Sequence, residues 1–255
     1  MDDAVLFETP EPGIALLTIN RPEKRNALAR DVREGLFAGW ERFERDPDLK
    51  VAVLTGAGDK AFCAGGDLKE MAQSGLVVPP RGMFPVPGDT IEVTKPTIAA
   101  VNGVAYAGGW LLAQSCDLCV AAAGARFAIT EAKVGRGSPW AAPLIHMIPQ
   151  RIFMEIVLTG EPIDARRAYE VGLVNRVAEP GELIAAALQL ARTIAANAPL
   201  SVLAGKETVH LSTEMGRTAA LRAARHAWET AYRSADAQEG PRAFAENRRP
   251  VWQGR

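Results

Sequence analysis

The stretch VAYAGGWLLAQSCD, Val104–Asp117, joins an extended apolar segment to a helical one through two adjacent glycines. The apolar residues before the glycines are typical of a buried strand, and Trp110 and two leucines begin a helix directly after them. Paired glycines cost backbone entropy and add no side chain to a core. Gly108-Gly109 therefore indicates either a turn that needs glycine or a ligand that approaches the backbone closely.

A second stretch, AFCAGGDLKE at 61–70, repeats this arrangement. Asp67 and Glu70 have the spacing of an N-cap and its N3 partner, which places Gly66 just ahead of a helix N-terminus. Helix N-termini expose unpaired N–H groups at the positive end of the helix dipole. Two such turns can each direct one N–H at the same oxygen, which is the geometry that stabilises an oxyanion on a carbonyl or thioester. The alternative is that both glycine pairs are ordinary strand-to-helix turns that bind no ligand, since such turns would show the same sequence pattern.

Outward from these turns, strand-like and helix-like segments alternate along the chain. Strands that alternate with helices over one continuous core predict an α/β fold with parallel character. VAVLT, Val51–Thr55, is fully apolar and is typical of a strand buried on both faces. The expected strands are 14–19, 51–55, 61–63, 97–101, 117–122 and 125–129, with a further extended piece after Gly103, and the expected helices are 27–45 and those that begin at Asp67 and after Gly109.

Two segments depart from this alternation. Residues 75–96 carry five prolines and little periodicity, which predicts a loop and a candidate lid. From Glu182 onward the pattern is helical, over 182–196, 200–211 and 214–234. We therefore expect a core over residues 1–195 and a helical region over 196–255.

Composition narrows the function classes. The 255 residues are 48% hydrophobic and 23% charged with a net charge of −1, so no bulk field favours nucleic acid or an anionic membrane. The N-terminal MDDAVLFETPEP lacks the apolar region of a signal peptide, and the longest apolar stretch, 97–113, is too short and broken to span a bilayer. We expect a cytoplasmic protein with neither membrane nor nucleic-acid partners.

The three cysteines do not form a disulfide framework. Cys116 and Cys119 make a C-x-x-C, but no second pair follows and the histidines have no ligand spacing. The motif also closes an apolar segment instead of opening a helix, as a redox pair would. We expect Cys63, Cys116 and Cys119 to be small buried hydrophobic residues, and no metal site.

Several longer stretches carry a family resemblance. They are NRPEKRNAL (20–28), VAVLTGAGDKAFCAGGDLKEM (51–71), KPTIAAVNGVAYAGG (95–109), CDLCVAAAGARFAITEAKVG (116–135), MEIVLTGEPIDARRAYEVGLVNRV (154–177) and FAENRRP (244–250). In these sequence motifs the chain resembles the crotonase superfamily, the enoyl-CoA hydratases and isomerases, almost from end to end. The pairing of AGGDLKEM with VNGVAYAGG is the most specific part of the match.

The resemblance implies a fold, a ligand and an assembly. The fold is a spiral of repeated ββα units with a C-terminal helical trimerisation region, and the assembly is a homotrimer or a dimer of trimers. The ligand is an acyl-CoA thioester, as in fatty acid metabolism, with no additional cofactor. The N–H groups of Gly66 and Gly108 would form the oxyanion hole.

The acid–base residues depart from the hydratase pattern. Hydratases of this family use two glutamates around one water; Glu131 matches one of them, and Leu111 stands where the other is expected. Pro139 occupies the position at which some dienoyl isomerases place an aspartate, and 135–143 contains no acid. A single glutamate suffices for double-bond isomerisation, because it can take a proton from the α-carbon and return it to the γ-carbon.

Three alternatives stay open at this point. Hydratase-like activity is one, and a catalytically weak acyl-CoA-binding protein is another, because a leucine cannot polarise water. Glu131 itself could be a surface partner of Lys133. If it is catalytic, burial beside Trp110, Leu111 and Trp140 would raise its pKa.

The remaining candidates concern substrate binding. Lys24, Arg25 and Lys69 flank the expected thioester site and suit CoA phosphates, while Arg248-Arg249 could reach the ligand of a neighbouring subunit. Trp110, Trp140 and Met83 could line an acyl pocket, although such positions also suit a plain core. The candidate substrate-binding residues are Lys24, Arg25, Ala27, Ala64, Asp67, Lys69, Trp110, Leu111 and Trp140.

Overall fold

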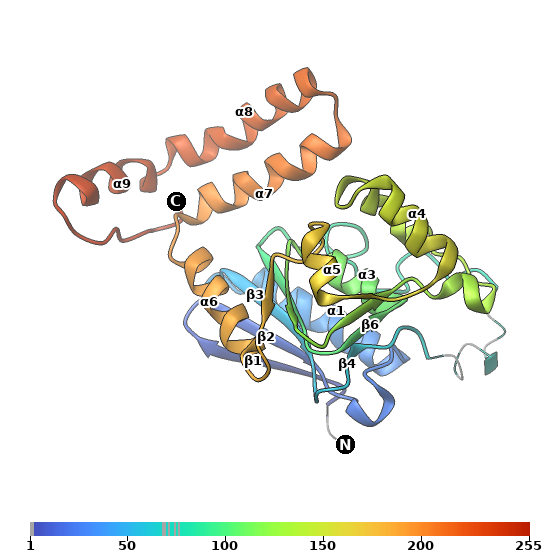
Figure 1. The fold of residues 1–255 in the computed structure, drawn as a ribbon. Coiled ribbons are helices and arrows are strands. Elements are labelled where there is room, and N and C mark those ends of the chain that lie inside the picture. The colour runs from blue at the N-terminus through green and yellow to red at the C-terminus, as the bar shows by residue number, and fades with distance from the viewer. Residues whose placement is uncertain (1–2, 68–69, 71, 74, 76) are drawn as a thin grey trace.

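Two mainly parallel sheets form the centre of the molecule in the computed structural model, which describes residues 3–67, 70, 72–73, 75 and 77–255 (Figure 1). The larger sheet has six strands in the order β1-β2-β3-β5-β7-β10, and the smaller has four in the order β4-β6-β8-β9. Only β1 with β2 and β8 with β9 pair antiparallel among these strands. The strands are β1 (Val5–Glu11), β2 (Ile14–Ile19), β3 (Val51–Gly56), β4 (Ala61–Cys63), β5 (Thr97–Val101), β6 (Val104–Tyr106), β7 (Leu118–Ala122), β8 (Arg126–Ala128), β9 (Ile163–Asp164) and β10 (Arg176–Ala178).

Helices cover both faces of the larger sheet and continue beyond it (Figure 1). The α-helices are α1 (Arg30–Arg45), α3 (Gly108–Gln114), α4 (Gln150–Thr159), α5 (Ala165–Glu170), α6 (Leu183–Ala195), α7 (Pro199–Glu214), α8 (Arg217–Arg233) and α9 (Asp236–Ala245). Three 3₁₀ segments, η1 (Pro22–Lys24), η2 (Glu131–Val134) and η3 (Pro139–His146), lie in the connections.

The central strands are apolar throughout because each face meets a different layer. Val51 and Val53 of β3 pack against α6, while Ala52 and Leu54 point into the larger core, which includes Trp40 of α1. This double burial explains why β3 shows no polar alternation. The predicted α/β class and the parallel character of the sheet are confirmed.

Two elements differ from the sequence-based expectation: β1 was not predicted, and α1 begins later than predicted. The edge strand β1 contains Pro10 and glutamates, so its sequence lacks a strand pattern; a proline and charges are tolerated there because the strand has only β2 as a neighbour. Helix α1 begins at Arg30 and not at residue 27, because Leu28 forms an isolated bridge with Gly66 and its N–H donates to the Gly65 carbonyl at 2.8 Å.

The last three helices form an arm that extends away from the sheets (Figure 1). Helices α7 and α8 pack against each other, and the chain after α9 returns to the base of the arm. Its return is fixed by Asp236, which is buried and accepts from the backbone N–H groups of Gln253 at 2.7 Å and Gly254 at 2.9 Å. We call residues 199–255 the helical arm.

No single helix in the described ranges has the length and apolar character needed to cross a bilayer; α6 and α7 reach it only as a pair bent by 108°. Within the described part of 75–96, the chain is irregular apart from a bridge between Pro87 and Ile91.

Candidate active site

The candidate site lies where three neighbouring parallel strands end. Strands β4, β6 and β8 pair side by side and parallel, with Ala61 opposite Val104 and Tyr106 opposite Ala128, and the β4–β6 register shifts between Ala61 and Cys63. The carboxyl ends of parallel strands meet at one edge of a sheet, so the segments that follow them are brought together. Those segments carry Gly66, Gly108 and Glu131, and all three residues line one cavity of about 1940 Å³.

The two glycine turns lie side by side at this edge. A Cβ atom placed on Gly65 would lie 3.4 Å from the Gly108 nitrogen, and one on Gly108 would lie 3.7 Å from the Gly66 nitrogen. No backbone acceptor within the described ranges takes the N–H of Gly66 or Gly108, and Gly108 is the first residue of α3, where helical N–H groups are left unpaired. The arrangement offers two unpaired donors beside a cavity.

The paired glycines of the quoted stretch are needed for different reasons. A Cβ on Gly109 would stand 2.0 Å from the carbonyl oxygen of Cys63, so α3 can lie against the end of β4 only without a side chain there. A Cβ on Gly108 would meet only the Cδ1 atom of Leu28 within 3.4 Å, at 2.9 Å. Gly109 therefore serves close backbone packing, and Gly108 presents backbone to the cavity.

Ala107, between β6 and α3, holds a backbone conformation that is rare for a residue with a side chain. Its φ of 50° and ψ of −119° lie in a region that glycine favours. The N–H of Ala107 donates to the carbonyl of Ala128 at 2.9 Å, which ties this turn to the segment that leads to Glu131. Such strained residues persist where the surrounding structure fixes them, commonly at functional sites.

Asn26 is a supporting residue that the sequence reasoning missed. It is fully buried, and its Nδ2 donates to the carbonyls of Ala57 at 3.0 Å and Ala61 at 2.7 Å, while its Oδ1 accepts from the N–H of Arg21. It thereby joins the loop before α1 to both ends of the β3–β4 turn. Asn26 has a positive φ of 55°, a backbone conformation that asparagine tolerates better than most residues. The sequence signal for this role was therefore the asparagine itself, between Arg25 and Ala27 in the motif NRPEKRNAL.

Glu131 is the acid that the structure buries beside the glycine turns. Its exposure is 8%, and its Oε1 accepts from the indole N–H of Trp140 at 3.2 Å. Its Oε2 is buried and has no hydrogen-bond partner in the described part of the chain. Burial raises the pKa of Glu131, and hydrogen bonds from its own backbone N–H and from Trp140 oppose that rise. Lys133 pairs instead with Glu161 at 2.7 Å, so Glu131 is not its surface partner.

Leu111 lies in the cavity wall with an exposure of 5%. The other acids among the described lining residues are engaged elsewhere or lie at the margin of the cavity. Asp67 accepts from the N–H of Glu70 at 3.2 Å, as the predicted cap does; Asp89 pairs with Arg81, and Asp117 with Lys206. Glu214 is exposed at the end of α7.

The structure brings most of the other sequence candidates to the same cavity. Trp110 is fully buried and packs edge-on against Phe127 at 5.8 Å between ring centroids, so it serves the core as well as the wall. Trp140 is half-buried on η3. The candidates that line the cavity are Lys24, Ala27, Ala64, Asp67, Met83, Trp110, Leu111 and Trp140.

Three described basic candidates, Arg25, Arg248 and Arg249, are not placed in that lining. Arg25 is exposed, and its carbonyl accepts from the N–H of Ala64 at 3.0 Å, so its backbone positions the first glycine turn. Arg248 pairs with Glu239 and Glu246 in the helical arm, and the adjacent Arg249 is exposed. Lys69 lies outside the described residues.

The cysteines are buried, as expected. Burial raises the pKa of the Cys63 and Cys119 thiols to about 12 and also raises that of Cys116. They therefore remain protonated at neutral pH and act as small apolar residues. No cluster of metal-ligating side chains occurs among the described residues.

Comparison with known proteins identifies the family. Residues 9–255 match the family model described as enoyl-CoA hydratase/isomerase. Similar proteins include (E)-benzylidenesuccinyl-CoA hydratase from Thauera aromatica, 39% identical over 94% of this chain and 96% of that one, and carnitinyl-CoA dehydratase from Salmonella typhi, 38% identical over 94% of each. The crystal structure of an enoyl-CoA hydratase from Mycobacterium tuberculosis H37Rv is 41% identical over 100% of both chains and superposes with a TM-score of 0.92.

The chain therefore belongs to the enoyl-CoA hydratase/isomerase family and has the crotonase fold, a spiral of ββα units.

Proposed function

We propose that the protein is an acyl-CoA enzyme that stabilises a thioester enolate with the N–H groups of Gly66 and Gly108 and moves protons with Glu131 alone. Double-bond isomerisation is the reaction that this set of groups favours. The observation that carries the proposal is the burial of Glu131 with one oxygen that has no partner among the described residues, in a cavity that Leu111 of the second acid position also lines.

The two amides would act on the thioester oxygen. Removing a proton from the α-carbon moves the C–H electrons toward that oxygen, and two fixed N–H donors stabilise the resulting charge. One donor of this kind typically contributes about 3 kcal/mol, or roughly 10²-fold in rate. The family membership and the adjacency of the two unpaired N–H groups support this assignment.

A single carboxylate completes an isomerisation without loss of atoms. Glu131 accepts the α-proton of a β,γ-enoyl thioester, the double bond shifts to the α,β position, and the same carboxyl returns a proton to the γ-carbon. The raised pKa of Glu131 suits this exchange, because a proton carrier works best when its pKa lies near the working pH.

Hydration is the second candidate, and one observation favours it: the similar proteins named above are a hydratase and a dehydratase. Addition of water needs a group that activates the water, and the Leu111 side chain in the wall cannot do so. In a hydratase reaction Glu131 would therefore have to serve both water and carbon.

The remaining parts of the proposal concern binding and assembly. Lys24 and Lys69 would contact the CoA phosphates, with Arg25 near them, and Trp110, Trp140 and Met83 would line the acyl pocket. Residues 196–255 would form the trimerisation region of a homotrimer or a dimer of trimers, in which Arg248 and Arg249 approach a neighbouring subunit's ligand. We propose no cofactor beyond the CoA of the substrate, a cytoplasmic location and neither nucleic-acid nor membrane partners.

Exchange of α-protons in D₂O tests the proposal. Acyl-CoA thioesters of increasing chain length, incubated with the protein and followed by NMR, should exchange their α-protons, and Glu131→Gln should slow that exchange at least 10²-fold. A parent protein that binds acyl-CoA without exchange would be a binding protein and not an enzyme. Exchange that survives Glu131→Gln would place the base elsewhere.

Leu111→Glu tests the missing acid. If that acid limits hydration, this variant should gain hydration of crotonyl-CoA over the parent. Brisk hydration of crotonyl-CoA by the parent itself would contradict the one-carboxylate mechanism.

A further inference from the structure

The two oxygens of the Glu131 carboxylate have different surroundings. Oε1 accepts the indole N–H of Trp140 at 3.2 Å, whereas the buried Oε2 has no partner in the described ranges. The last side-chain torsion of glutamate is broad and nearly two-fold, so the two carboxylate oxygens can exchange places unless a neighbour holds one of them. One N–H bound to one oxygen removes that ambiguity.

An indole N–H is suited to this task because it donates and never accepts. Trp140 can hold Oε1 without competing for the proton that Glu131 carries. Burial also raises the pKa of the Glu131 carboxyl against the hydrogen bonds from Trp140 and from its own backbone N–H, so the carboxylate keeps its basicity.

Trp140 is itself held in place by a hydrogen bond from the helix that begins with Gly108. The Nε2 of Gln114, the last residue of α3, donates to the Trp140 carbonyl at 2.8 Å, and Gln114 is buried. The same seven-residue helix therefore carries one proposed oxyanion donor at its first residue and supports the partner of Glu131 at its last.

We propose that Trp140 is a positioning residue for Glu131, supported by Gln114, and that it fixes Oε2 as the oxygen that takes and returns the substrate proton. This inference rests on the function proposed above and adds to it which atom reacts and which residues hold it there. The proton passes from the α-carbon to Oε2 and from Oε2 to the γ-carbon, while Oε1 keeps its bond to Trp140 throughout.

Charged neighbours do not explain the properties of Glu131. The charged or titratable side chains on η2, η3, α4 and the loop between the 3₁₀ segments are exposed or half-buried: Lys133, Arg136, His146, Arg151 and Glu155. Burial raises the pKa of Glu131, and the hydrogen bonds from its own backbone N–H and from Trp140 oppose that rise without reversing it.

Trp140→Phe is the direct test, because it keeps the ring and removes the N–H. We expect kcat to fall about tenfold with KM nearly unchanged, since a hydrogen bond to a charged group is lost while the pocket wall remains. The acid limb of the kcat/KM profile should move to higher pH, because the lost bond stabilised the ionised carboxylate. Gln114→Met should change kcat and the acid limb in the same directions by less.

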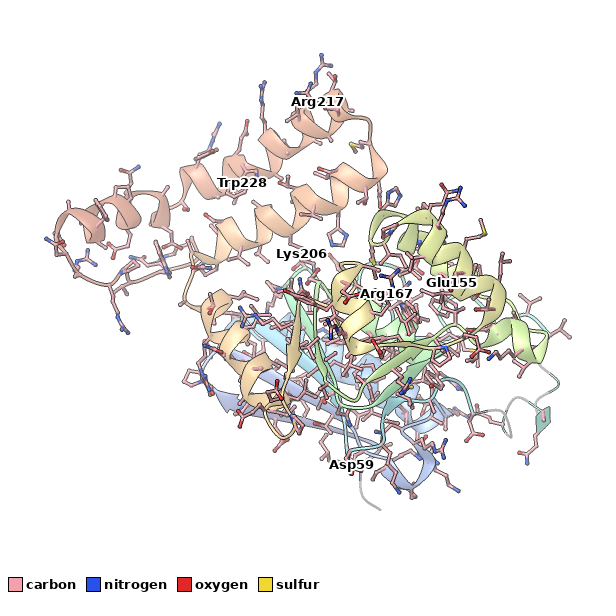
Figure 2. All side chains as sticks on the ribbon, in the orientation of Figure 1. Asp59, Glu155, Arg167, Lys206, Arg217 and Trp228 are labelled. Carbon is pink, nitrogen blue, oxygen red and sulfur yellow. The ribbon has the colours of Figure 1, made fainter. Side chains whose placement is uncertain are left out.

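The matched control is Trp228→Phe. Trp228 on α8 (Figure 2) donates its indole N–H to the Thr208 hydroxyl at 2.9 Å, and neither residue lines the cavity, so kcat and the acid limb should stay at parent values. If Trp140→Phe also leaves both at parent values, the positioning role is wrong. A KM increase with the acid limb unmoved would mean that Trp140 only shapes the pocket, and would equally overturn it.

A measurement on the unmodified protein covers the case in which Trp140→Phe fails to fold. The indole N–H resonance of Trp140, assigned by NMR, should titrate with the midpoint of the acid limb and should stop titrating in Glu131→Gln. A resonance unaffected by Glu131 would overturn the inference. The proposed function is judged separately, because it fails if the parent lacks α-proton exchange, if Glu131→Gln retains that exchange, or if the parent hydrates crotonyl-CoA briskly.

Discussion

The Nζ of Lys206 on α7 lies 2.9 Å from Oδ2 of Asp117, the residue directly before β7, and both side chains are largely buried. Lys206 also donates to the carbonyls of Val93 at 3.1 Å and Lys95 at 2.9 Å. Asp117 accepts in addition from the N–H and hydroxyl of Thr97. Figure 2 shows Lys206 between the helical arm and the sheets, so this pair fastens the arm to the core.

Lys206→Met should destabilise the protein by about 2 kcal/mol, because it leaves a mostly buried carboxylate and two carbonyls without their shared donor. The free energy of unfolding in urea measures this loss. Lys133→Met is the matched control: its pair with Glu161 is exposed, with side-chain exposures of 43% and 71%, and should cost no more than about 0.5 kcal/mol. Equal effects of the two substitutions would show that the arm is not fastened at Asp117.

The stability contributed by Asp117 should depend on pH. Burial alone would raise its pKa, but contacts with His210, Lys206 and the Thr97 N–H outweigh burial and hold the pKa below its usual value. A group with a lowered folded-state pKa stabilises the protein above its unfolded pKa, about 4, and this contribution is lost as pH falls. The difference in unfolding free energy between parent and Lys206→Met should therefore shrink from pH 7 toward pH 3. A constant difference over that range would contradict this account.

Glu131 should have the opposite pH dependence. Its folded-state pKa is raised, so it favours the folded state at low pH, and that contribution disappears as pH rises through the folded-state pKa. At pH 8 Glu131→Gln should melt at a higher temperature than the parent, with an unfolding free energy larger by up to about 1 kcal/mol, and at pH 4 it should melt near the parent temperature. Scanning calorimetry at the two pH values checks this, and a variant less stable than the parent at pH 8 would argue against a costly buried carboxylate.

Gly109→Ala should prevent correct folding or cost several kcal/mol, because its Cβ would occupy space 2.0 Å from the Cys63 carbonyl oxygen and the backbone must move to make room. Gly124→Ala is the control, since a Cβ there meets no atom within 4 Å. Soluble yield and thermal melting compare the two variants. A Gly109→Ala variant as stable as Gly124→Ala would mean that α3 and β4 are less tightly packed than described.

Ala107→Gly should relieve backbone strain. The strain of a positive φ at a residue with a side chain is roughly 1–3 kcal/mol, and the entropy of the added glycine offsets about 1 kcal/mol of any gain. We expect unchanged or slightly higher stability together with a lower kcat, because the turn that carries Gly108 becomes freer. The free energy of unfolding and the steady-state kcat, measured on the same preparation, test these two effects. A clear loss of stability would contradict the expected relief of strain.

The sequence was sufficient for strands β2, β3, β5 and β7 of the larger sheet and for the two glycine turns, because local patterns encode them. The apolar run of β3 and the glycines before α3 depend on their immediate surroundings. The family motifs then pointed to Glu131 and to its burial beside Trp140, although the hydrogen bond from the indole N–H to Oε1 could not be read from them.

What the sequence could not provide depends on distant contacts. Trp140 approaches Glu131 through two 3₁₀ segments whose sequence shows no clear period, and Lys206 meets Asp117 from 89 residues away along the chain (206 minus 117). β1 was missed because an edge strand tolerates the proline and charges that hide it. These features become visible only when the chain is folded.

The sheet edge and the rest of the cavity wall differ in how freely evolution can alter them. Gly66, Gly108 and Glu131 follow strands whose register and backbone packing leave almost no freedom, whereas much of the remaining wall belongs to η3 and to the irregular chain before Pro96. Replacing side chains in those outer segments would leave the strand ends undisturbed. If the proposed function holds, a lineage built on this scaffold can therefore exchange one acyl group for another while its proton chemistry is inherited unchanged.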